Sequence, residues 1–488
     1  MIHISIVWLK SSIQTENNRL MKNIFLILIS VFFLSGCEEN VISETNILLK
    51  NVNIVDVENG VLLPAKHVAI QGEKIVAIYE EKEIVPSNSA LVIDGKGKYL
   101  IPGLWDMHTH FNWNFKFSSP MLVANGVTGV REMWGVMDRI KEVRKRVLVD
   151  DLIAPDIYSA GAIIDGDPPF WPNSSGVKDA EMAKDEVDQQ VFEGVDFIKV
   201  YSLLTREAYI AIAERSKERN IPFAGHVPIS ISIWDAVAAG QQSIEHLDGI
   251  LEGCSTNDKI LSAPLKERFN IKWTNTLLDS FEPALLDSLA NYLAKSETWL
   301  SPTLIVLRNT ANLDDPDLIK DPRLAYIPEF IRERWNPVND FRFKNNKTEY
   351  FEIGRKKFQL QLSFIKALEK AGVKMIVGTD YPNPYCFPGF SLHDEMQLMV
   401  KAGLTNAATL KCATYNPALF MGKEDEFGTV EVGKKASLIL LDGNPLENIT
   451  NTERISSVFL RGRYLDRNKL DELLEEAKIN ATKAKNPF

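Results

Sequence analysis

The sequence predicts an α/β protein: a (β/α)8 TIM-like barrel with a small β-sandwich domain built from both termini. Three observations predict this fold. Apolar strands alternate with helical patterns through the middle of the chain, and short strands separated by turns occupy each of the two flanks. Eight strand–helix units over roughly 300 residues fit a (β/α)8 barrel. The flanking strands are expected to meet each other as one small sandwich.

Composition narrows the class of protein before any motif is considered. The 488-residue chain is 45% hydrophobic and 25% charged, which is ordinary for a globular protein with one large and one smaller domain. Its net charge of -10 comes without any lysine- or arginine-rich run, so no nucleic-acid partner is expected. The 4 cysteines form no CxxC pair or dense cluster, which argues against a disulfide framework.

Residues 21–37 are predicted to be a lipoprotein signal peptide that begins at Met21. The stretch MKNIFLILISVFFLSGC has a basic start and an apolar run that is short for a membrane span. Its end, LSGC, resembles a bacterial lipobox, so Cys37 is expected to carry lipid that binds the membrane. The alternative is an uncleaved anchor or a plain signal peptide. The expected location is the cell envelope, and Glu38 after the cysteine favours the outer membrane in a Gram-negative host.

The remaining elements are expected in a fixed order along the chain. Residues 38–45 are a tether, 46–98 the first part of the β-sandwich, 99–422 the barrel, 423–466 the second part of the sandwich, and 467–488 a charged helical tail outside the core. The barrel strands are expected at KYLIPGLWD, GVTGVREM, DIYSAGA, VDFIKVYS, IPFAGHV, QQSIEHL, TWLSPTL and VKMIVGTD. Helical patterns lie between most of them, such as REAYIAIAERSKERN and GRKKFQLQLSFIKALEKAG.

Two histidines follow the first barrel strand. In PGLWDMHTH, His108 and His110 are two residues apart, so in a strand their side chains point to the same face. Active sites of (β/α)8 barrels lie at the C-terminal ends of the strands. Two imidazoles at that end suit a metal such as Zn2+. The pair alone does not exclude a structural role, because HxH also occurs by chance.

Four further polar residues occupy the ends of later strands: His226 in IPFAGHV, His246 in QQSIEHL, Asp380 in VKMIVGTD and Lys199 in VDFIKVYS. Together with the histidine pair, six polar residues stand at the ends of five apolar strands. As ordinary core residues, each would need a separate hydrogen-bonding partner. A shared metal site explains all six at once.

This pattern resembles the amidohydrolase superfamily. The resemblance covers residues 46–466, and the stretches IKVY, GHVP, SIEHL, GTD, SLHDEM and GTVEVGKKASLILLDGNPLE resemble its prolidase-like branch. It implies two divalent metal ions, with Zn2+ expected, bridged by an N6-carboxylated lysine on the fourth barrel strand. Mapped onto this sequence, the metal ligands are His108, His110 and Asp380 for one ion, His226 and His246 for the other, and Lys199 for both.

The resemblance also implies the reaction. A hydroxide that bridges the two ions attacks an amide carbonyl, and Asp380 passes its proton to the leaving amine. The reaction class is hydrolysis of an amide or a related C–N bond. The expected partners are small-molecule substrates, namely dipeptides of the Xaa-Pro kind or N-acyl amino acids.

The chemistry of Lys199 is consistent with such a bridge. A protonated ammonium cannot bind a metal, but burial and nearby cations lower the pKa of a lysine. The neutral amine can then react with carbon dioxide, and the carbamate is a carboxylate on a long arm. The alternative is a surface or salt-bridged lysine, which the apolar neighbours in DFIKVY argue against.

The sequence leaves the roles of other residues near the strand ends open. Tyr201 shares the strand face of Lys199 and is a candidate catalytic residue that stabilises an oxyanion. His393 in SLHDEM either touches substrate or supports the site, and Arg131 either binds a substrate carboxylate or forms a structural ion pair. The loop IIDGDPPFWP and the segment 308–347 are expected to overhang the barrel mouth and to set specificity.

Other functions remain alternatives. A mononuclear zinc deaminase of the same superfamily would use the histidines and Asp380 without needing Lys199. A lactonase, or a carbamate or phosphotriester hydrolase, could use the same metal site. A non-catalytic binding protein would be expected to have lost ligands that this chain retains. The oligomeric state is left open, and a homo-oligomer is compatible with the sequence.

Overall fold

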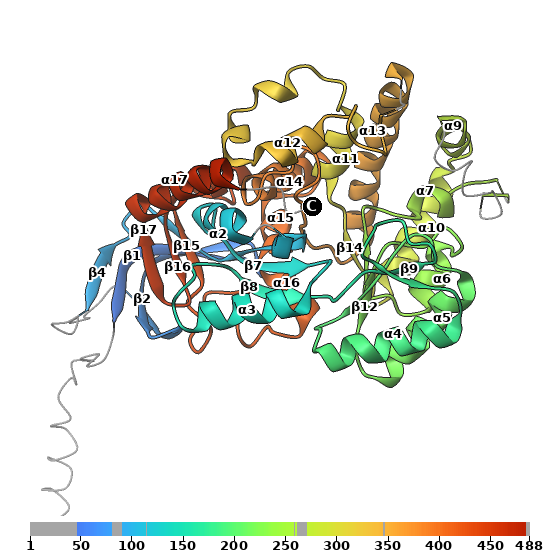
Figure 1. Cartoon of the computed structure of the whole chain (residues 1–488). Coiled ribbons are helices and arrows are strands. Elements are labelled where there is room, and N and C mark those ends of the chain that lie inside the picture. Colours follow the sequence, from blue (N-terminus) through green and yellow to red (C-terminus); the bar gives the residue numbers. More distant parts are fainter. Residues whose placement is uncertain are drawn as a thin grey trace, which may run out of the picture.

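The computed structural model describes residues 46–80, 90–113, 115–257, 259–260, 271–344 and 347–484. The predicted signal peptide, Cys37 and the tether lie outside these residues, so the lipid anchor stays a prediction. Among the described helices, none combines the length and the hydropathy needed to cross a membrane. Figure 1 shows a mixed α/β fold, in which a sheet at one end adjoins a body of helices and shorter strands.

An eight-stranded sheet is built from both ends of the described chain. Its order is β17-β16-β15-β5-β1-β2-β3, with β4 paired to β1. The two ends meet where β5 pairs antiparallel with β15, and Ile101 lies opposite Ile439. The sheet has its own core cluster, which includes Val52, Leu438 and Phe459. The two flanking segments of the expected sandwich therefore meet in one continuous sheet around this core.

The strands of this terminal sheet are β1 (Ile47–Asp56), β2 (Val61–Gln71), β3 (Lys74–Tyr79), β4 (Leu91–Asp94), β5 (Tyr99–Pro102), β15 (Leu438–Leu441), β16 (Ile455–Leu460) and β17 (Arg463–Asp466).

Parallel strands occupy the middle of the chain, in two sheets that do not close into one paired barrel. The first sheet has the order β6-β7-β8, and the second has the order β10-β9-β11-β12-β13-β14. Isolated bridges join Ala160 after β8 to Phe197 before β11, and Thr109 at the end of β6 to Tyr381. The strands therefore follow the ring order of the predicted barrel, and the expectation of a barrel is met in part.

The strands of these two sheets are β6 (Leu104–Thr109), β7 (Val127–Glu132), β8 (Asp156–Ser159), β9 (Ile164–Gly166), β10 (Ser175–Val177), β11 (Ile198–Val200), β12 (Phe223–Gly225), β13 (Ser243–Glu245) and β14 (Trp299–Ser301).

The last predicted barrel strand, VKMIVGTD, is not a regular strand in the structure. It still runs between β14 and β6. On one side a bridge joins Met375 to Leu300, and on the other the Asp380 amide donates to the His108 carbonyl at 2.8 Å. This segment therefore brings Asp380 beside the first parallel strand.

Two predicted segments divide differently from expectation. KYLIPGLWD splits into β5 of the terminal sheet and β6 of the parallel strands, so the parallel strands begin after residue 102. The break falls at Gly103, where a Cβ atom would lie 2.0 Å from Thr128 Oγ1. The segment IIDGDPPFWP, expected as a loop, starts with β9, because Ile164 pairs with Val200 at the edge of β11.

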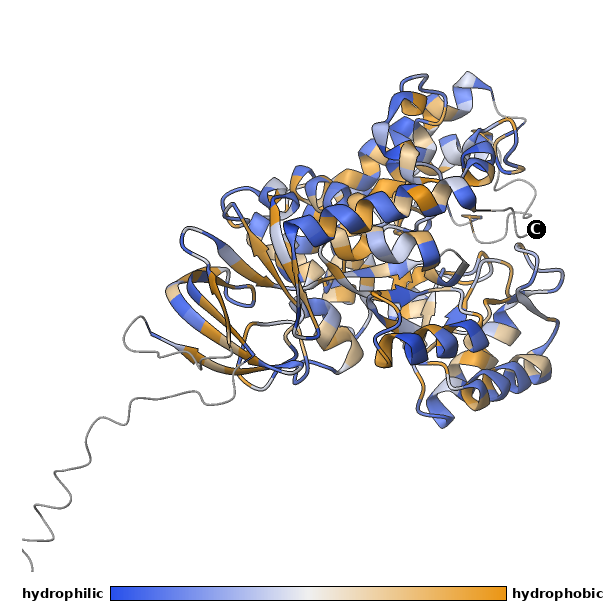
Figure 2. Ribbon diagram, turned by 60° about the vertical axis from the view of Figure 1, so that its left-hand side comes forward, coloured by the Kyte–Doolittle hydropathy of each residue, from blue (hydrophilic) through white to orange (hydrophobic). Residues whose placement is uncertain are grey.

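Helices cover the parallel strands and begin at recognisable caps. The Thr205 side chain accepts a hydrogen bond from the Ala208 amide at the start of α5, and the Asp179 side chain does the same for two amides of α4. In Figure 2 the helices carry both hydrophilic and hydrophobic residues, as expected for elements with one buried face.

The helices of the first half of the chain are η1 (Phe111–Trp113), α2 (Phe115–Ala124), α3 (Met137–Leu148), α4 (Ala180–Glu193), α5 (Arg206–Glu218), α6 (Ile233–Ala238) and α7 (Ile250–Gly253). The later helices are α9 (Ile271–Asp279), α10 (Pro283–Ala294), α11 (Leu304–Ala311), η3 (Leu318–Lys320), η4 (Pro322–Tyr326), α12 (Glu329–Trp335), α13 (Thr348–Ala371), α14 (Phe390–Lys401), α15 (Asn406–Ala413), α16 (Tyr415–Met421), η5 (Ile449–Glu453) and α17 (Arg467–Lys483).

The C-terminal tail is packed against the body, contrary to the expectation that it lies outside the core. Helix α17 lies beside α2 (Figure 1). It buries Leu470, Leu473, Ala477 and Ala481. The spacing of these residues makes one apolar stripe along an otherwise charged helix. The charge of the segment hid this stripe in the sequence prediction.

Candidate metal centre

Strand β6 carries a row of polar side chains on one face. Asp106 and His108 are two residues apart, so they share that face, and both are buried. The Asp106 carboxylate accepts hydrogen bonds from the amide and the hydroxyl of Thr379, at 3.0 and 2.6 Å. These bonds fasten β6 to the segment that ends at Asp380.

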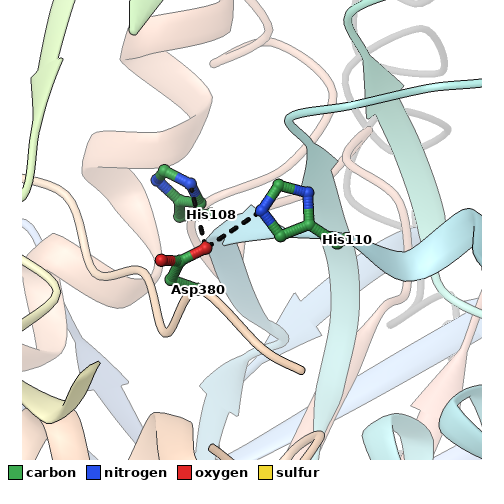
Figure 3. Close-up of side chains that lie close together, drawn as sticks. All are labelled: His108, His110 and Asp380. Atoms are coloured by element: carbon green, nitrogen blue, oxygen red, sulfur yellow. Dashed lines mark hydrogen bonds and ion pairs between the residues drawn. The ribbon is translucent and has the colours of Figure 1, made fainter. Parts of the chain in front are cut away.

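His108, His110 and Asp380 form a compact group that can hold a metal ion. One donor atom from each residue lies within 4.8 Å of the other two. The Oδ1 atom of Asp380 is 3.0 Å from His110 Nε2 and 3.4 Å from His108 Nε2. Figure 3 shows both imidazole rings beside this one oxygen. The structure thus brings together the predicted ligands of the first ion.

The other two predicted histidines extend this group into a row. The His246 ring centroid lies 4.6 Å from that of His108, and the His226 centroid lies 4.7 Å from that of His246. His246 and Asp380 have positive φ angles of 60° and 59°. For non-glycine residues this backbone costs about 1–3 kcal/mol, and such strain clusters at functional sites.

Lys199 on β11 is 1% exposed and interacts electrostatically with the row, including His108 and Asp380. Its Nζ atom has no hydrogen-bond partner among the described residues. Burial lowers the pKa of Lys199 to about 8, so a fraction of the amine is neutral near physiological pH. On β12, Gly225 leaves room for the lysine arm, because a Cβ atom there would lie 3.0 Å from Lys199 Cδ. A buried amine without a partner fits a group that becomes a ligand.

A buried ion pair, whose carboxylate Glu245 was not identified from the sequence, orients His108. The Nδ1 atom of His108 donates to Glu245 at 2.8 Å, which leaves Nε2 available to a metal. Arg131 donates to both carboxylate oxygens of Glu245, at 2.8 and 2.9 Å, and to the Ser243 hydroxyl at 2.8 Å. All four residues are buried. Of the two roles considered for Arg131, the geometry fits the structural ion pair.

Strand alternation in SIEHL was the signal that could have revealed Glu245. Ser243 and Glu245 are two residues apart on β13, so they share the face that Arg131 contacts from β7. The pairing itself could not be read from the sequence, because β7 and β13 belong to different sheets.

Hydrogen bonds also orient the other two histidines. The Thr303 hydroxyl lies 2.7 Å from His246 Nδ1, and an Asp248 carboxylate oxygen lies 2.7 Å from His226 Nδ1. Thr303 in turn precedes α11, whose first two amides donate to Glu395 at 2.8 and 2.6 Å. Glu395, the glutamate of SLHDEM, is therefore connected to the site through the backbone that carries Thr303.

Tyr201 lies at the edge of the row. Its ring centroid is 4.1 Å from that of His226, and its hydroxyl accepts a hydrogen bond from Trp171 Nε1 at 2.7 Å. The residue is thus close enough to the predicted second metal position to remain a candidate for contact with substrate.

His393 is not brought into the row. Its two ring nitrogens lie 2.9 Å from the Thr452 hydroxyl and 3.0 Å from the Asn125 carbonyl. These partners lie on η5 and just before β7. The geometry therefore fits a residue that joins α14 to neighbouring segments, and we leave His393 out of the proposed catalytic residues.

The electrostatic surroundings favour the metal-binding forms of the ligands. Burial lowers the pKa of His108 well below its usual value and that of His246 to about 4. Burial raises the pKa of Asp380, but the positive charge that His108 carries when protonated and the hydrogen bond from His110 outweigh burial and hold that pKa well below its usual range. Neutral imidazoles and ionised carboxylates are the forms that coordinate metal ions.

Comparison with known proteins agrees with this geometry. Residues 336–465 match the amidohydrolase family, a region that includes Asp380 and the last three strands of the terminal sheet. Proteins similar in sequence include ochratoxinase of Aspergillus niger, 22% identical over 416 residues, with 72% of this chain and 71% of the relative covered. A 5-methylthioadenosine/S-adenosylhomocysteine deaminase of Caldanaerobacter subterraneus subsp. tengcongensis is 21% identical over 421 residues, covering 82% of this chain and 85% of the relative.

Solved structures of other proteins share the fold of this chain. The bottromycin amidohydrolase superposes with a TM-score of 0.71 at 22% identity, covering 89% of this chain and 90% of that one. A Xaa-Pro dipeptidase with bound methionine in the active site gives a TM-score of 0.61 at 18% identity, covering 86% and 99%.

Proposed function

We propose that the protein is a metal-dependent hydrolase of amide C–N bonds that binds two divalent ions, taken as Zn2+, bridged by N6-carboxylated Lys199. The observation that carries the proposal is the buried cluster itself. Four histidines lie in one row beside Asp380, and the amine of Lys199 next to them has no hydrogen-bond partner among the described residues.

We assign a separate role in the proposed reaction to each residue of the cluster. Bound divalent ions supply Lewis-acid activation of the amide carbonyl and of water. Asp380 is proposed to take a proton from the attacking water and to return it to the leaving nitrogen. Glu245 and Thr303 keep two imidazole rings in fixed orientations. Tyr201 is proposed to donate its hydroxyl proton to the developing oxyanion.

Small amides are the proposed substrates, namely dipeptides of the Xaa-Pro kind or N-acyl amino acids. The likeness to a Xaa-Pro dipeptidase in fold and to ochratoxinase in sequence supports this class without identifying the substrate. A lactonase, or a carbamate or phosphotriester hydrolase, would use the same ligands, so esters of these kinds belong in any substrate panel.

A mononuclear zinc deaminase is the second candidate, because one relative of similar identity is a deaminase. Such an enzyme would use the histidines and Asp380 but would have no use for an amine at Lys199. The buried, unpartnered Nζ atom of that lysine therefore favours the binuclear hydrolase.

The experiment is a hydrolysis assay with zinc-loaded, metal-depleted and His108→Ala protein, on a panel of dipeptides and N-acyl amino acids. The proposal expects amide cleavage by the zinc-loaded protein alone, with return of activity when zinc is added back to depleted wild type. Full amide hydrolysis by the metal-free protein would overturn it. Release of ammonia from aminated purines, with no amide cleavage, would support the deaminase.

We also propose that the mature protein is anchored to the cell envelope by lipid on Cys37. The signal-like stretch before this cysteine supports the proposal. Cys37→Ser should release the protein from membranes or leave it unprocessed in fractionated cells. A mature N-terminus at another residue, without lipid, would contradict the proposal.

A further inference from the structure

We infer that an arc of aromatic side chains above the candidate metal centre selects substrates with a planar aromatic group next to the scissile amide. The inference deepens the proposed function and rests on it. It starts from five aromatic residues that are not among the proposed metal ligands, contributed by separate segments of the chain: Trp134, Phe170, Trp171, Tyr201 and Phe341.

The arc begins at a metal ligand. Trp134, which follows β7, has its ring centroid 6.2 Å from that of His110, in an edge-on orientation. Its next neighbour is Trp171, which follows β9, with ring centroids 6.5 Å apart. Aromatic rings at such separations and tilted angles interact favourably.

The arc also ends at a metal ligand. Trp171 packs edge-on against Phe170 at 5.3 Å, and Phe170 lies 6.1 Å from Tyr201. The Trp171 Nε1–H···Oη bond to Tyr201 fastens the loop to β11, and the Tyr201 ring lies 4.1 Å from that of His226. The rings therefore run continuously from one end of the histidine row to the other.

The segment that follows α12 also contributes a ring, Phe341, to the arc. The Phe341 ring lies 5.7 Å from that of Phe170 and 5.5 Å from that of Trp171. Beside it, the guanidinium of Arg342 lies 5.4 Å from the Trp171 ring centroid and donates to the Asn383 side chain at 3.1 Å. The segment is thus joined both to the arc and to the loop that follows Asp380.

The arc retains aromatic surface for a ligand. Phe341 is 54% exposed, and the other four rings are only half-buried, unlike the core aromatics of the protein. Aromatic faces of this kind bury a planar ring and pack against it in edge-on or offset geometry. Because the arc runs from His110 to His226, we expect the acyl or side-chain group next to the cleaved bond to contact it.

The test uses zinc-loaded protein and two matched pairs of substrates, N-acetyl-phenylalanine with N-acetyl-alanine and Phe-Pro with Ala-Pro. We expect kcat/KM to favour the phenylalanine member of the cleaved pair by at least about tenfold. Phe341→Ala should remove most of this preference, and Phe341→Leu should restore only part of it, because leucine replaces apolar volume without the ring. Phe192→Ala removes a phenylalanine that is 87% exposed on α4, and it should leave the preference unchanged.

Equilibrium binding provides a readout that does not need turnover. The phenylalanine compounds should bind more tightly than the alanine compounds in calorimetric titrations and should perturb tryptophan fluorescence, with both effects reduced in Phe341→Ala. Cleavage without a preference for phenylalanine overturns the arc and leaves the proposed hydrolase intact. Aromatic-selective, Phe341-dependent binding without any cleavage supports the arc and counts against the hydrolase. If the protein shows no aromatic selectivity in binding and none in cleavage, the proposed role of the arc is overturned.

Discussion

At the residue scale, the ion pair between Arg131 and Glu245 matters because neither side chain has any contact with solvent. Removing one member of a buried pair leaves an uncompensated charge and costs about 3–5 kcal/mol. We therefore expect Arg131→Met to lower the free energy of unfolding by about this amount, measured by urea denaturation. Arg131→Met combined with Glu245→Gln should cost less than the sum of the two single changes. Additive costs would contradict the pairing.

Glu245 is also expected to affect the affinity for the metal ion. Because Glu245 accepts the Nδ1–H of His108, it fixes the tautomer that presents Nε2. Glu245→Gln should weaken zinc binding by about 10–100-fold, measured by competition with a chromophoric chelator. Glu297→Gln is the control, because its side chain is 97% exposed before β14. Equal zinc affinities in the two variants would argue against an orienting role.

At the scale of elements, α14 is held in place by a buried, neutral His393. Burial lowers the pKa of His393 to about 4, whereas the unfolded chain has the ordinary value of 6.5. Below that value the unfolded state binds a proton that the folded state does not, so stability falls as pH falls. Between about pH 7.5 and about pH 5 this single group should cost about 2 kcal/mol. His393→Gln should lose this part of the acid sensitivity in urea titrations, and an unchanged pH dependence would contradict the account.

Helix α17 offers a second test at this scale. Leu470 is fully buried in the stripe that packs on the body, whereas Ile479 on the same helix is 44% exposed. Leu470→Ala should destabilise the protein by about 2–5 kcal/mol, because it removes buried methyl groups and leaves a cavity. Ile479→Ala should change stability by about 0.5 kcal/mol or less, because it lies away from the packed stripe. Equal shifts in melting temperature would mean that the helix is not docked as described.

At the scale of the whole molecule, the features set by strand periodicity were predictable from the sequence. His108, Lys199, His226 and His246 stand at strand ends because apolar runs stop there, and parallel strands bring those ends together. Features that depend on partners across the fold were not predictable. Arg131 pairs with Glu245 across two sheets, and α17 packs against α2, which lies more than three hundred residues earlier in the chain.

Other differences have local causes. The strand expected before Asp380 is irregular, yet its few backbone bonds to β14 and β6 suffice to place the carboxylate. The sequence left two roles open for His393, contact with substrate or support of the site, because SLHDEM follows that strand closely. Its helix instead directs the imidazole to Thr452 and Asn125. Proximity in sequence to a ligand did not place the side chain in the site.

If Lys199 bridges two metal ions, its replacement removes a ligand of both, so the decisive measurement is the zinc content of wild type and Lys199→Ala. Both proteins would be reconstituted with zinc and bicarbonate, dialysed, and analysed by mass spectrometry for zinc per chain, with turnover recorded in parallel. The account predicts about two zinc ions in wild type, and at most one in Lys199→Ala with turnover lower by several orders of magnitude. Bicarbonate should speed zinc uptake by wild type and leave the variant unaffected. Two zinc ions and near-normal turnover in Lys199→Ala would contradict the bridge.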